Sequence, residues 1–282
     1  MFLNRVAYFA LKIFPNELAT RFVGYISDAR VPKLLLAVMI EAYSLAFGAN
    51  LGESEKQIPE FATLNEFFTR KLKPGARKIA PSKTAIISPV DGTVQAFGKI
   101  DAGKLIQAKG KDYTLEALLS DEPAAKGFLG GSFITIYLHP RDYHRIHAPL
   151  SGGITGYQYV PGSLFPVNSL SLNAVDGLFA RNERLITYME TRAGKVAVIK
   201  VGACLVGRIR ASYCGFVAKS SVKAPVKCGF THKIDVTKGD ELGMFELGST
   251  VILLFQKDKI KFGKMKSGER IMMGESIARI ST

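Results

Sequence analysis

Apolar and β-branched residues run without interruption through residues 251–255, directly after a Gly-Ser-Thr step at residues 248–250. A short apolar run of this kind, next to a turn-forming step, is typical of a buried strand. Similar runs alternate with glycine-rich turns from about residue 85 onwards, and recurring short strands predict an antiparallel β-sandwich or barrel-like core. These runs predict strands at residues 85–88, 92–97, 132–138, 153–157, 184–190, 196–201, 208–209 and 277–280, and short helices at residues 114–119 and 140–143.

The first 14 residues have a different pattern, because apolar side chains recur at helical spacing and Pro15 ends the run. The stretch is too short to span a bilayer, and it lacks the small-residue cleavage site of a secretory signal. Two alternatives remain open for it. It is either an interfacial helix that lies on a membrane or a helix that packs on the protein's own core.

Further helical segments follow before the β-rich part of the chain. Residues 16–31 predict a second helix capped by Asn16, and residues 34–47 predict a third helix after Pro32. A short helix is expected at residues 63–70, where Thr63 and Glu66 have the spacing of a capping box. We therefore predict an α+β fold with an N-terminal apolar helical region at residues 1–80 and a β-rich catalytic domain at residues 81–282.

The charge balance narrows the choice of partners. The chain has 38 Lys and Arg against 24 Asp and Glu, a net charge of +14, and such a surface favours polyanions. No nucleic-acid-binding motif accompanies the charge, so an anionic membrane surface is favoured over nucleic acid. The lysines at residues 257–266 fit a membrane-facing patch or a solvated edge. Three cysteines without a Cys-x-x-Cys pair indicate a reducing cytosol.

Three polar residues supply the types needed for nucleophilic catalysis. Asp91 follows a predicted strand, His147 ends a histidine-rich segment, and Ser249 precedes the buried run at 251–255. A serine nucleophile, a histidine base and a carboxylate that orients the base form such a set. Each segment taken alone also fits an ordinary turn.

The order of three motifs makes the set specific. Residues 89–92 read Pro-Val-Asp-Gly, residues 139–147 read His-Pro-Arg-Asp-Tyr-His-Arg-Ile-His, and residues 247–250 read Leu-Gly-Ser-Thr. In this order they resemble the phosphatidylserine decarboxylases, a family of pyruvoyl-dependent enzymes. The resemblance continues through residues 67–70, 161–168 and 179–184, and it covers roughly residues 60–275.

The resemblance implies self-processing between Gly248 and Ser249, which divides the chain into residues 1–248 and 249–282. The Ser249 hydroxyl attacks the Gly248 carbonyl to form an ester, with His147 as base and Asp91 as the residue that orients it. Elimination then leaves dehydroalanine, which hydrolyses to a pyruvoyl group and ammonia. A prosthetic group made from the chain itself takes the place of pyridoxal phosphate.

The implied reaction belongs to phospholipid biosynthesis. The amine of phosphatidylserine forms a Schiff base with the pyruvoyl carbonyl, carbon dioxide leaves, and protonation gives phosphatidylethanolamine. His144 is the candidate proton donor, since it lies three residues before His147 and a helix would place both on one face; a structural hydrogen bond is the alternative. The resemblance also implies a homodimer, peripheral on the cytoplasmic side of a bacterial inner membrane.

Contacts with the lipid substrate are predicted from charge and context only. The segment at residues 160–169 is either a substrate-side loop, in which Phe165 touches acyl chains, or a rigid surface turn. A guanidinium group suits a phosphate because it donates two parallel hydrogen bonds. The candidates for the head-group phosphate are Arg141, Arg145, Arg70, Arg181 and Arg184.

Two other classes of protein fit parts of the sequence. Imidazole groups of His139, His144 and His147, with Asp91, would suit a zinc-dependent hydrolase, but that hypothesis leaves the Leu-Gly-Ser-Thr motif unexplained. A non-catalytic, basic membrane-binding protein would explain the charge alone. A Ser249→Ala substitution separates the classes, because only the self-processing enzyme depends on that hydroxyl.

Overall fold

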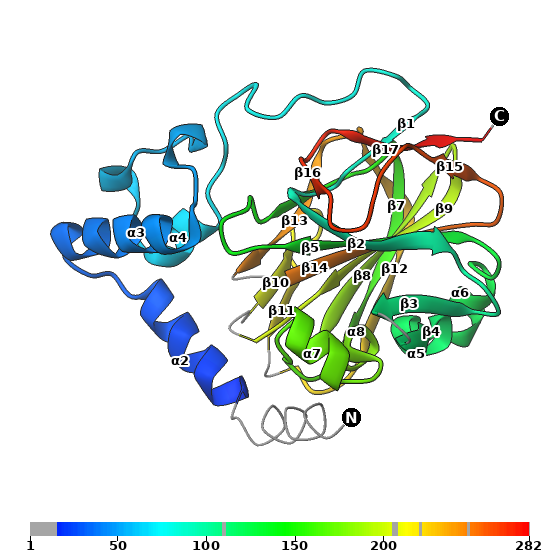
Figure 1. The fold of residues 1–282 in the computed structure, drawn as a ribbon, viewed down its shortest axis with the longest axis horizontal. Helices are drawn as coiled ribbons and strands as arrows, with labels where there is room; N and C mark the ends of the chain where they lie inside the picture. Colours follow the sequence, from blue (N-terminus) through cyan, green and yellow to red (C-terminus); the bar gives the residue numbers. More distant parts are fainter. Residues whose placement is uncertain (1–15, 109–110, 205–207, 220–221, 247–248, 282) are drawn as a thin grey trace.

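The computed structural model describes residues 16–108, 111–204, 208–219, 222–246 and 249–281. The predicted helix at residues 1–14 lies outside the described residues. The described chain begins with helices that stand beside a large β core (Figure 1). These elements are α2 (Asn16–Asp28), α3 (Lys33–Phe47), single 3₁₀ turns at Leu51–Glu53 and Ile58–Glu60, and α4 (Leu64–Phe68). None of the helices in the described ranges is long and apolar enough to cross a membrane.

Local signals account for where these helices begin and end. Pro32 precedes α3, and Gly48 ends it with φ of 75°, a left-handed conformation that glycine adopts without strain. Thr63 caps α4 by accepting a hydrogen bond from the Glu66 amide at 3.1 Å. The Glu66 carboxylate reaches back one residue further than a capping box requires, to the amide of Ala62 at 2.7 Å. The predicted cap of α4 is therefore confirmed, with this difference in its second hydrogen bond.

The helices have a small core of their own. Leu36 and Ile40 of α3 pack with Phe61 and Phe67 in a cluster separate from the main core. An extended connection at residues 71–84 then passes over the top of the molecule to the first strand (Figure 1). The predicted boundary between residues 80 and 81 falls in this connection, and the division into two domains stays a prediction.

The β core is antiparallel, as predicted. Its main sheet has eight strands in the order β12-β7-β8-β9-β14-β5-β2-β16. Their bounds are β2 (Gly92–Lys99), β5 (Ser132–Leu138), β7 (Gly152–Val160), β8 (Arg184–Thr191), β9 (Gly194–Val201), β12 (Val226–Val236), β14 (Ser249–Phe255) and β16 (Arg270–Ile271). Within the described residues this sheet is open, with β12 and β16 at its edges.

Smaller sheets complete the core. A four-stranded sheet has the order β11-β10-β13-β6, and its side chains join those of the main sheet in one buried cluster. Its strands are β6 (Arg145–His147), β10 (Arg208–Ala211), β11 (Val217–Lys219) and β13 (Glu241–Glu246). The remaining strands are β1 (Ala85–Ile87), β15 (Ile260–Phe262) and β17 (Ser276–Ile280) in one sheet, and β3 (Lys104–Ala108) and β4 (Lys111–Thr114) in another. The short helices are α5 (Leu115–Leu119), α6 (Glu122–Lys126), α7 (Ser169–Ala174) and α8 (Leu178–Arg181).

Strand β14 lies at the centre of the main sheet, between β9 and β5. Every residue from Val251 to Phe255 is fully buried, so the predicted buried strand at residues 251–255 is confirmed. The helix predicted at residues 140–143 is wrong, because this segment forms a turn. Asp142 closes the turn twice, since its amide donates to the His139 carbonyl and its carboxylate accepts from the His139 amide, both at 2.8 Å.

Candidate active site

One end of the main sheet, where strands β2 and β14 begin and β5 ends, brings together the three segments singled out in the sequence. Thr93 of β2 and Thr250 of β14 pair with Tyr137 of β5 from its two sides. Neighbouring strands lie about 4.8 Å apart, so these two threonines are on the order of 10 Å apart. Asp91 comes immediately before β2, and Ser249 is the first residue of β14. The structure therefore places Asp91 and the Ser249 backbone at the same end of the sheet, two strands apart.

The bond predicted to break is only partly described. Gly248 lies outside the described residues, and the structure describes the backbone of Ser249, which pairs with Leu138. On the other side of β5, Gly92 allows close approach of β2. A Cβ atom at Gly92 would lie 2.4 Å from the Tyr137 carbonyl oxygen, and only glycine avoids that clash. The glycine after Asp91 thus allows the start of β2 to lie close against β5.

The Asp91 carboxylate is buried, with 1% of its side chain exposed, and an arginine holds both of its oxygens. Nε of Arg77 donates to the two oxygens at 2.9 and 3.0 Å, and a terminal nitrogen of Arg77 donates to Oδ2 at 2.5 Å. The amide of Met273 donates to Oδ1 at 2.8 Å. Sequence reasoning missed Arg77, which sits in a basic stretch with a Pro-Gly turn and has no periodic signal.

His147 ends β6, and its ring is held by groups other than Asp91. Its Nδ1–H donates to the Gly239 carbonyl at 2.7 Å, and Nε2 accepts from the Tyr143 hydroxyl at 3.1 Å. Burial lowers the pKa of His147, so the ring is neutral near pH 7. Among the described side chains no hydrogen bond joins Asp91 to this ring. The two residues are instead neighbours through the backbone, since the His147 amide donates to the Pro89 carbonyl at 2.8 Å.

His144 lies close to the segment that leads to the predicted cleavage bond. Its carbonyl accepts from the amide of Phe245 in β13, three residues before Gly248. Its Nδ1–H donates to the Asp142 carbonyl at 2.8 Å, and its ring lies 4.1 Å from that of Phe68 in α4. Nε2 is buried without a hydrogen-bond partner among the described residues. Burial lowers the pKa of His144 to about 3, so the ring is neutral near pH 7 and this nitrogen can accept a hydrogen bond.

The histidines do not share a helical face, and that part of the prediction is wrong. His147 belongs to strand β6, His139 is the first residue of the turn at residues 139–143, and His144 follows that turn. In the part of the chain that the structure describes, no group of three His, Cys, Asp or Glu residues is arranged to hold a metal ion. Both ring nitrogens of His147 already have partners. The zinc-hydrolase alternative therefore has no ligand set in the described residues.

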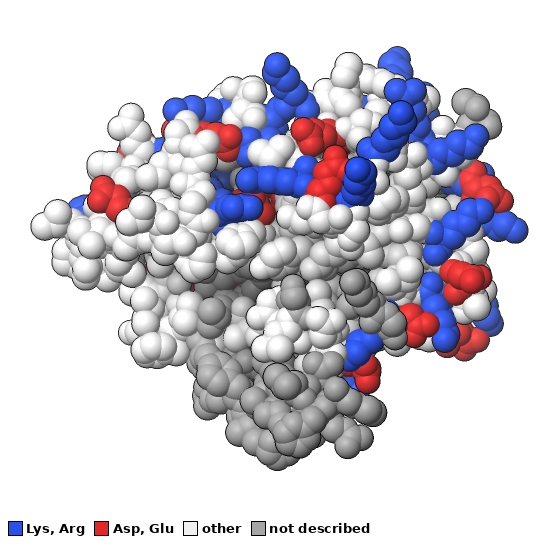
Figure 2. Space-filling model, in the orientation of Figure 1, with Lys and Arg blue, Asp and Glu red and all other residues white. Residues whose placement is uncertain are grey.

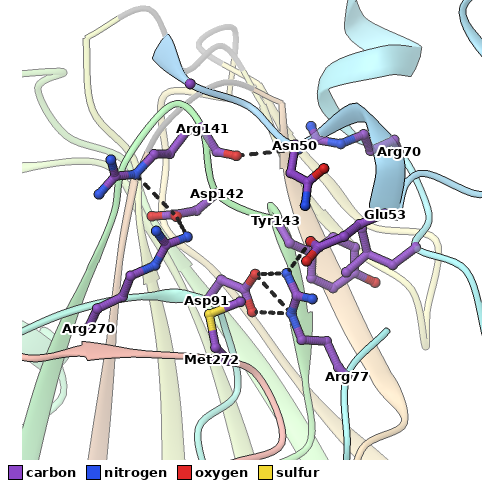
Figure 3. Close-up of a pocket in the computed structure, with 12 residues that line it drawn as sticks. Asn50, Glu53, Arg70, Arg77, Asp91, Arg141, Asp142, Tyr143, Arg270 and Met272 are labelled. Carbon is purple, nitrogen blue, oxygen red and sulfur yellow. Dashed lines mark hydrogen bonds and ion pairs between the residues drawn. The ribbon is translucent and has the colours of Figure 1, made fainter. Parts of the chain in front are cut away.

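A polar pocket of about 430 Å³ opens beside Asp91, between the N-terminal region and the β core (Figure 3). Four arginines and three carboxylates line it: Arg70, Arg77, Arg141, Arg270, Glu53, Asp91 and Asp142. Two of the guanidiniums lie near the Asp142 carboxylate, Arg270 at 3.1 Å and Arg141 at 3.9 Å. About half of each of these two side chains is exposed, so both remain accessible to an anion in the pocket.

The other arginines proposed from the sequence are engaged within the fold. Arg145 donates to the Thr69 carbonyl at 2.9 Å and to the Glu241 carboxylate at 2.7 Å. Arg70 is buried, donates to the Arg141 carbonyl at 3.3 Å and lies over the Phe67 ring. The buried Arg184 guanidinium donates to four backbone carbonyls and to one serine hydroxyl. Arg184 therefore supports the fold and has no donor left for a phosphate, and Arg181 lies at the end of α8, apart from the residues that line this pocket.

The loop at residues 160–169 is fixed to the same end of the main sheet. Asn182 accepts from the Phe165 amide at 3.0 Å and donates to the Phe165 and Gly202 carbonyls, both at 2.9 Å. Gly202 follows Val201, the residue paired with Thr250. A second pocket of about 280 Å³ lies beside this loop, lined in part by Leu164, and the Phe165 side chain is largely buried.

A buried carboxylate, two buried neutral histidines and a serine at one edge of a rigid antiparallel core are the parts of an enzyme. The chain belongs to the phosphatidylserine decarboxylase family, a family of carboxy-lyases. The model of the family described as "Phosphatidylserine decarboxylase" matches residues 64–279.

Curated relatives agree over nearly the whole chain. A protein of Anaeromyxobacter sp. (strain K) is 44% identical over 277 residues, which cover 97% of this chain and 98% of the relative. A protein of Myxococcus xanthus (strain DK1622) is 42% identical over 272 residues, 96% of this chain and 97% of the relative. A protein of Brevibacillus brevis is 44% identical over 273 residues, 94% of each chain. All three are called phosphatidylserine decarboxylase proenzyme.

Proposed function

We propose that this chain is a proenzyme that cleaves itself between Gly248 and Ser249 and then decarboxylates phosphatidylserine to phosphatidylethanolamine. The observation that carries the proposal is the position of Ser249 at the start of central strand β14. The same end of the sheet also holds Asp91 and the turn at residues 139–143. The names of the relatives support both the proenzyme and its substrate.

The cleavage balances without an outside oxidant or metal. The Ser249 hydroxyl oxygen bonds to the Gly248 carbonyl carbon, and the C–N bond breaks to free the Ser249 amine. Loss of the Ser249 Cα proton and of the ester oxygen from Cβ separates the two chains. Gly248 becomes a carboxylate, and residue 249 becomes dehydroalanine. Water then replaces the nitrogen, which releases ammonia and leaves a pyruvoyl group at the new N-terminus.

The residues around this position fit such a group. Two buried polar atoms in the segments around it have no hydrogen-bond partner among the described residues: Oγ1 of Thr250, the next residue, and Nε2 of His144, whose carbonyl accepts from the Phe245 amide. Of these, Nε2 of His144 is the atom proposed to bond to a small polar group that forms at residue 249, because the Thr250 side chain lies on the opposite face of β14. The carbonyl of a pyruvoyl group would supply an electron sink for loss of carbon dioxide. Nε2 of His144 takes a proton from water and passes it to the carbon that lost the carboxylate. His147 holds the proton removed from Ser249 during processing.

The polar pocket beside Asp91 is the proposed site for the head-group phosphate. Arg141, predicted from the sequence, and Arg270, found in the structure, present half-exposed guanidiniums there. Arg145 acts less directly, because its hydrogen bond to the Thr69 carbonyl ties the histidine segment to the end of α4. Phe165 keeps its proposed role in the loop at residues 160–169, near the acyl chains of the lipid.

The N-terminal helices are the proposed membrane surface, on the cytoplasmic side of a bacterial inner membrane. α2 and α3 expose large apolar side chains, among them Leu34 at 80% and Leu45 at 89%. Figure 2 shows that the surface over α3 and α4 carries few charged groups, whereas basic side chains gather over the upper part of the molecule. With a net charge of +14, the protein is attracted to an anionic bilayer that contains its substrate. A homodimer of processed protomers completes the proposal.

The intact mass of the denatured, purified protein tests this function. We expect two fragments, residues 1–248 and 249–282, with the smaller one lighter than its serine form by one ammonia. Ser249→Ala should remain a single chain and release no carbon dioxide from vesicles that contain phosphatidylserine. Ser281→Ala, on the same short fragment, is the matched control and should be processed and active. A wild-type chain at full mass, or processed protein that leaves phosphatidylserine unchanged, would overturn the proposal.

A further inference from the structure

Arg77 reaches Asp91 from a part of the chain outside the β core. It lies in the connection between α4 and β1, which has neither helix nor strand around it. Only 8% of the Arg77 side chain is exposed, and Figure 3 shows its guanidinium directed at the Asp91 carboxylate on the wall of the polar pocket. With three contacts to two oxygens, the geometry is that of a bidentate charge-assisted pair.

A second carboxylate, that of Glu53, also binds the Arg77 guanidinium. Glu53 accepts from a terminal nitrogen of Arg77 at 2.8 Å, and the Ala76 carbonyl accepts from the other at 2.8 Å. Glu53 belongs to the 3₁₀ turn Leu51–Glu53, and its carbonyl accepts from the Lys73 amide at 2.9 Å. The bridge between Ser54 and Leu72 joins the same two stretches. Residues 51–55 and 71–77 thus form one paired unit that presents Arg77 to the core.

The energetics make this pair more than a surface contact. Asp91 is 1% exposed, and apart from Arg77 its carboxylate has one hydrogen-bond donor among the described residues, the Met273 amide. A buried carboxylate without a cation is strongly disfavoured, so removal of Arg77 alone leaves the buried Asp91 carboxylate without its charged partner. The carboxylate would then lose both its charge balance and its orientation.

We propose that Arg77 is a positioning residue for self-cleavage: it pairs with the buried Asp91 carboxylate and orients it, and it makes cleavage depend on the docking of residues 51–77. The inference rests on the proposed function, because it assigns a purpose to Asp91 in processing. The Glu53–Arg77–Asp91 chain of ion pairs links the N-terminal region to the edge where Ser249 lies. A chain in which this region has not yet docked would therefore remain a proenzyme.

The test follows cleavage of newly synthesised full-length chains over time on denaturing gels. Arg77→Ala should cleave about 100-fold more slowly than wild type, as expected when one partner of a buried pair is lost. Guanidinium ions at millimolar concentration should restore much of the rate, since they fit the space left beside Asp91. Sodium chloride at equal ionic strength should not. Arg192→Ala, an exposed arginine on the turn between β8 and β9, is the matched control and should cleave like wild type.

Arg77→Lys keeps the charge but loses the bidentate contact, so it should fold and cleave about tenfold more slowly than wild type. If Arg77→Ala fails to fold, the cleavage rate of Arg77→Lys tests the proposal in its place. Cleavage of Arg77→Ala or Arg77→Lys at the wild-type rate would overturn the inference while leaving the proposed function intact. Slow cleavage that guanidinium does not restore, together with a lowered melting temperature, would show a structural role only. A wild-type chain that never cleaves would instead defeat the proposed function.

Discussion

The Tyr143 hydroxyl donates to Nε2 of His147 across 3.1 Å, and the two rings stack with their centroids 5.5 Å apart. With the Gly239 carbonyl on the other ring nitrogen, this contact fixes the tautomer, so that Nδ1 carries the proton and Nε2 accepts. Burial raises the pKa of Tyr143, which keeps its phenol protonated and able to donate. Tyr143 therefore orients the His147 ring, the proposed base, through a direct hydrogen bond that Asp91 does not make.

Tyr143→Phe is predicted to slow self-cleavage about tenfold, since it removes one hydrogen bond to the base and keeps the stacked ring. The melting temperature should change little. The measurement is the half-time of cleavage of newly made chains on denaturing gels. Tyr213→Phe is the control. It also removes one tyrosine hydrogen bond, the 2.6 Å contact with Oγ1 of Thr187, but this contact does not involve His147. Equal half-times for wild type and Tyr143→Phe would contradict this role.

Elements with a strong local signal could be predicted from the sequence. The apolar run at residues 251–255 is fully buried in β14, and the helix expected at residues 34–47 is α3, which begins one residue earlier at Lys33. Thr114 caps α5 at the predicted place. These features depend on residues close together in the chain, and the antiparallel core followed from the recurrence of such runs.

Features that depend on distant contacts could not be predicted. The sequence predicts a short helix at residues 140–143, but the Asp142 carboxylate binds the His139 amide and Arg270, and closes a turn. Strand β12 was missed because its exposed, polar positions carry no apolar run. The contact between Arg77 and Asp91 could not be predicted, because an irregular connection brings the two residues together. The order of motifs identified the residue types of the site, but their hydrogen-bond partners required the structure.

His144→Asn is predicted to separate processing from decarboxylation. Asparagine retains a polar side chain but cannot transfer a proton, so the two fragments should form while product formation falls about 100-fold. The measurements are the fragment masses and the carbon dioxide released from phosphatidylserine vesicles. His232→Asn, on the exposed strand β12, is the matched control and should retain full activity. Full decarboxylase activity in His144→Asn would remove this residue from the reaction.

Replacement of both Leu34 and Leu45 by Asp is predicted to weaken vesicle binding at least tenfold. The two substitutions remove apolar area from α3 and add negative charge opposite an anionic surface. Flotation with vesicles that contain phosphatidylserine measures the effect, and self-cleavage should continue. Leu129→Asp changes a half-exposed leucine in the turn after α6 and should bind like wild type. Unchanged flotation of the double variant would place the membrane surface elsewhere.

Lys200 is a fully buried lysine in the described core. It lies in β9 opposite Val251, its side chain is 0% exposed, and its Nζ contacts Oγ1 of Thr187 at 2.5 Å. Burial lowers the pKa of Lys200 to about 7, from an ordinary value of 10.5. Between these two values the unfolded chain binds a proton that the folded chain does not. The free energy of unfolding should therefore rise with pH in this window, and fall again as pH drops towards 7.

Lys200→Met isolates that contribution, because methionine has a similar length and does not titrate. At pH 7 the variant should be at its most stable relative to the parent, both carried in the uncleaved Ser249→Ala chain. The difference should shift in favour of the lysine form by about 1.4 kcal/mol per pH unit as pH rises from 7. Urea unfolding at several pH values measures it. The lost hydrogen bond to Thr187 adds an offset that is nearly the same at each pH, so only the slope is diagnostic. A difference that stays constant up to pH 9 would mean that Lys200 keeps its proton in the folded core, and that Thr187 and its neighbours stabilise a buried ammonium.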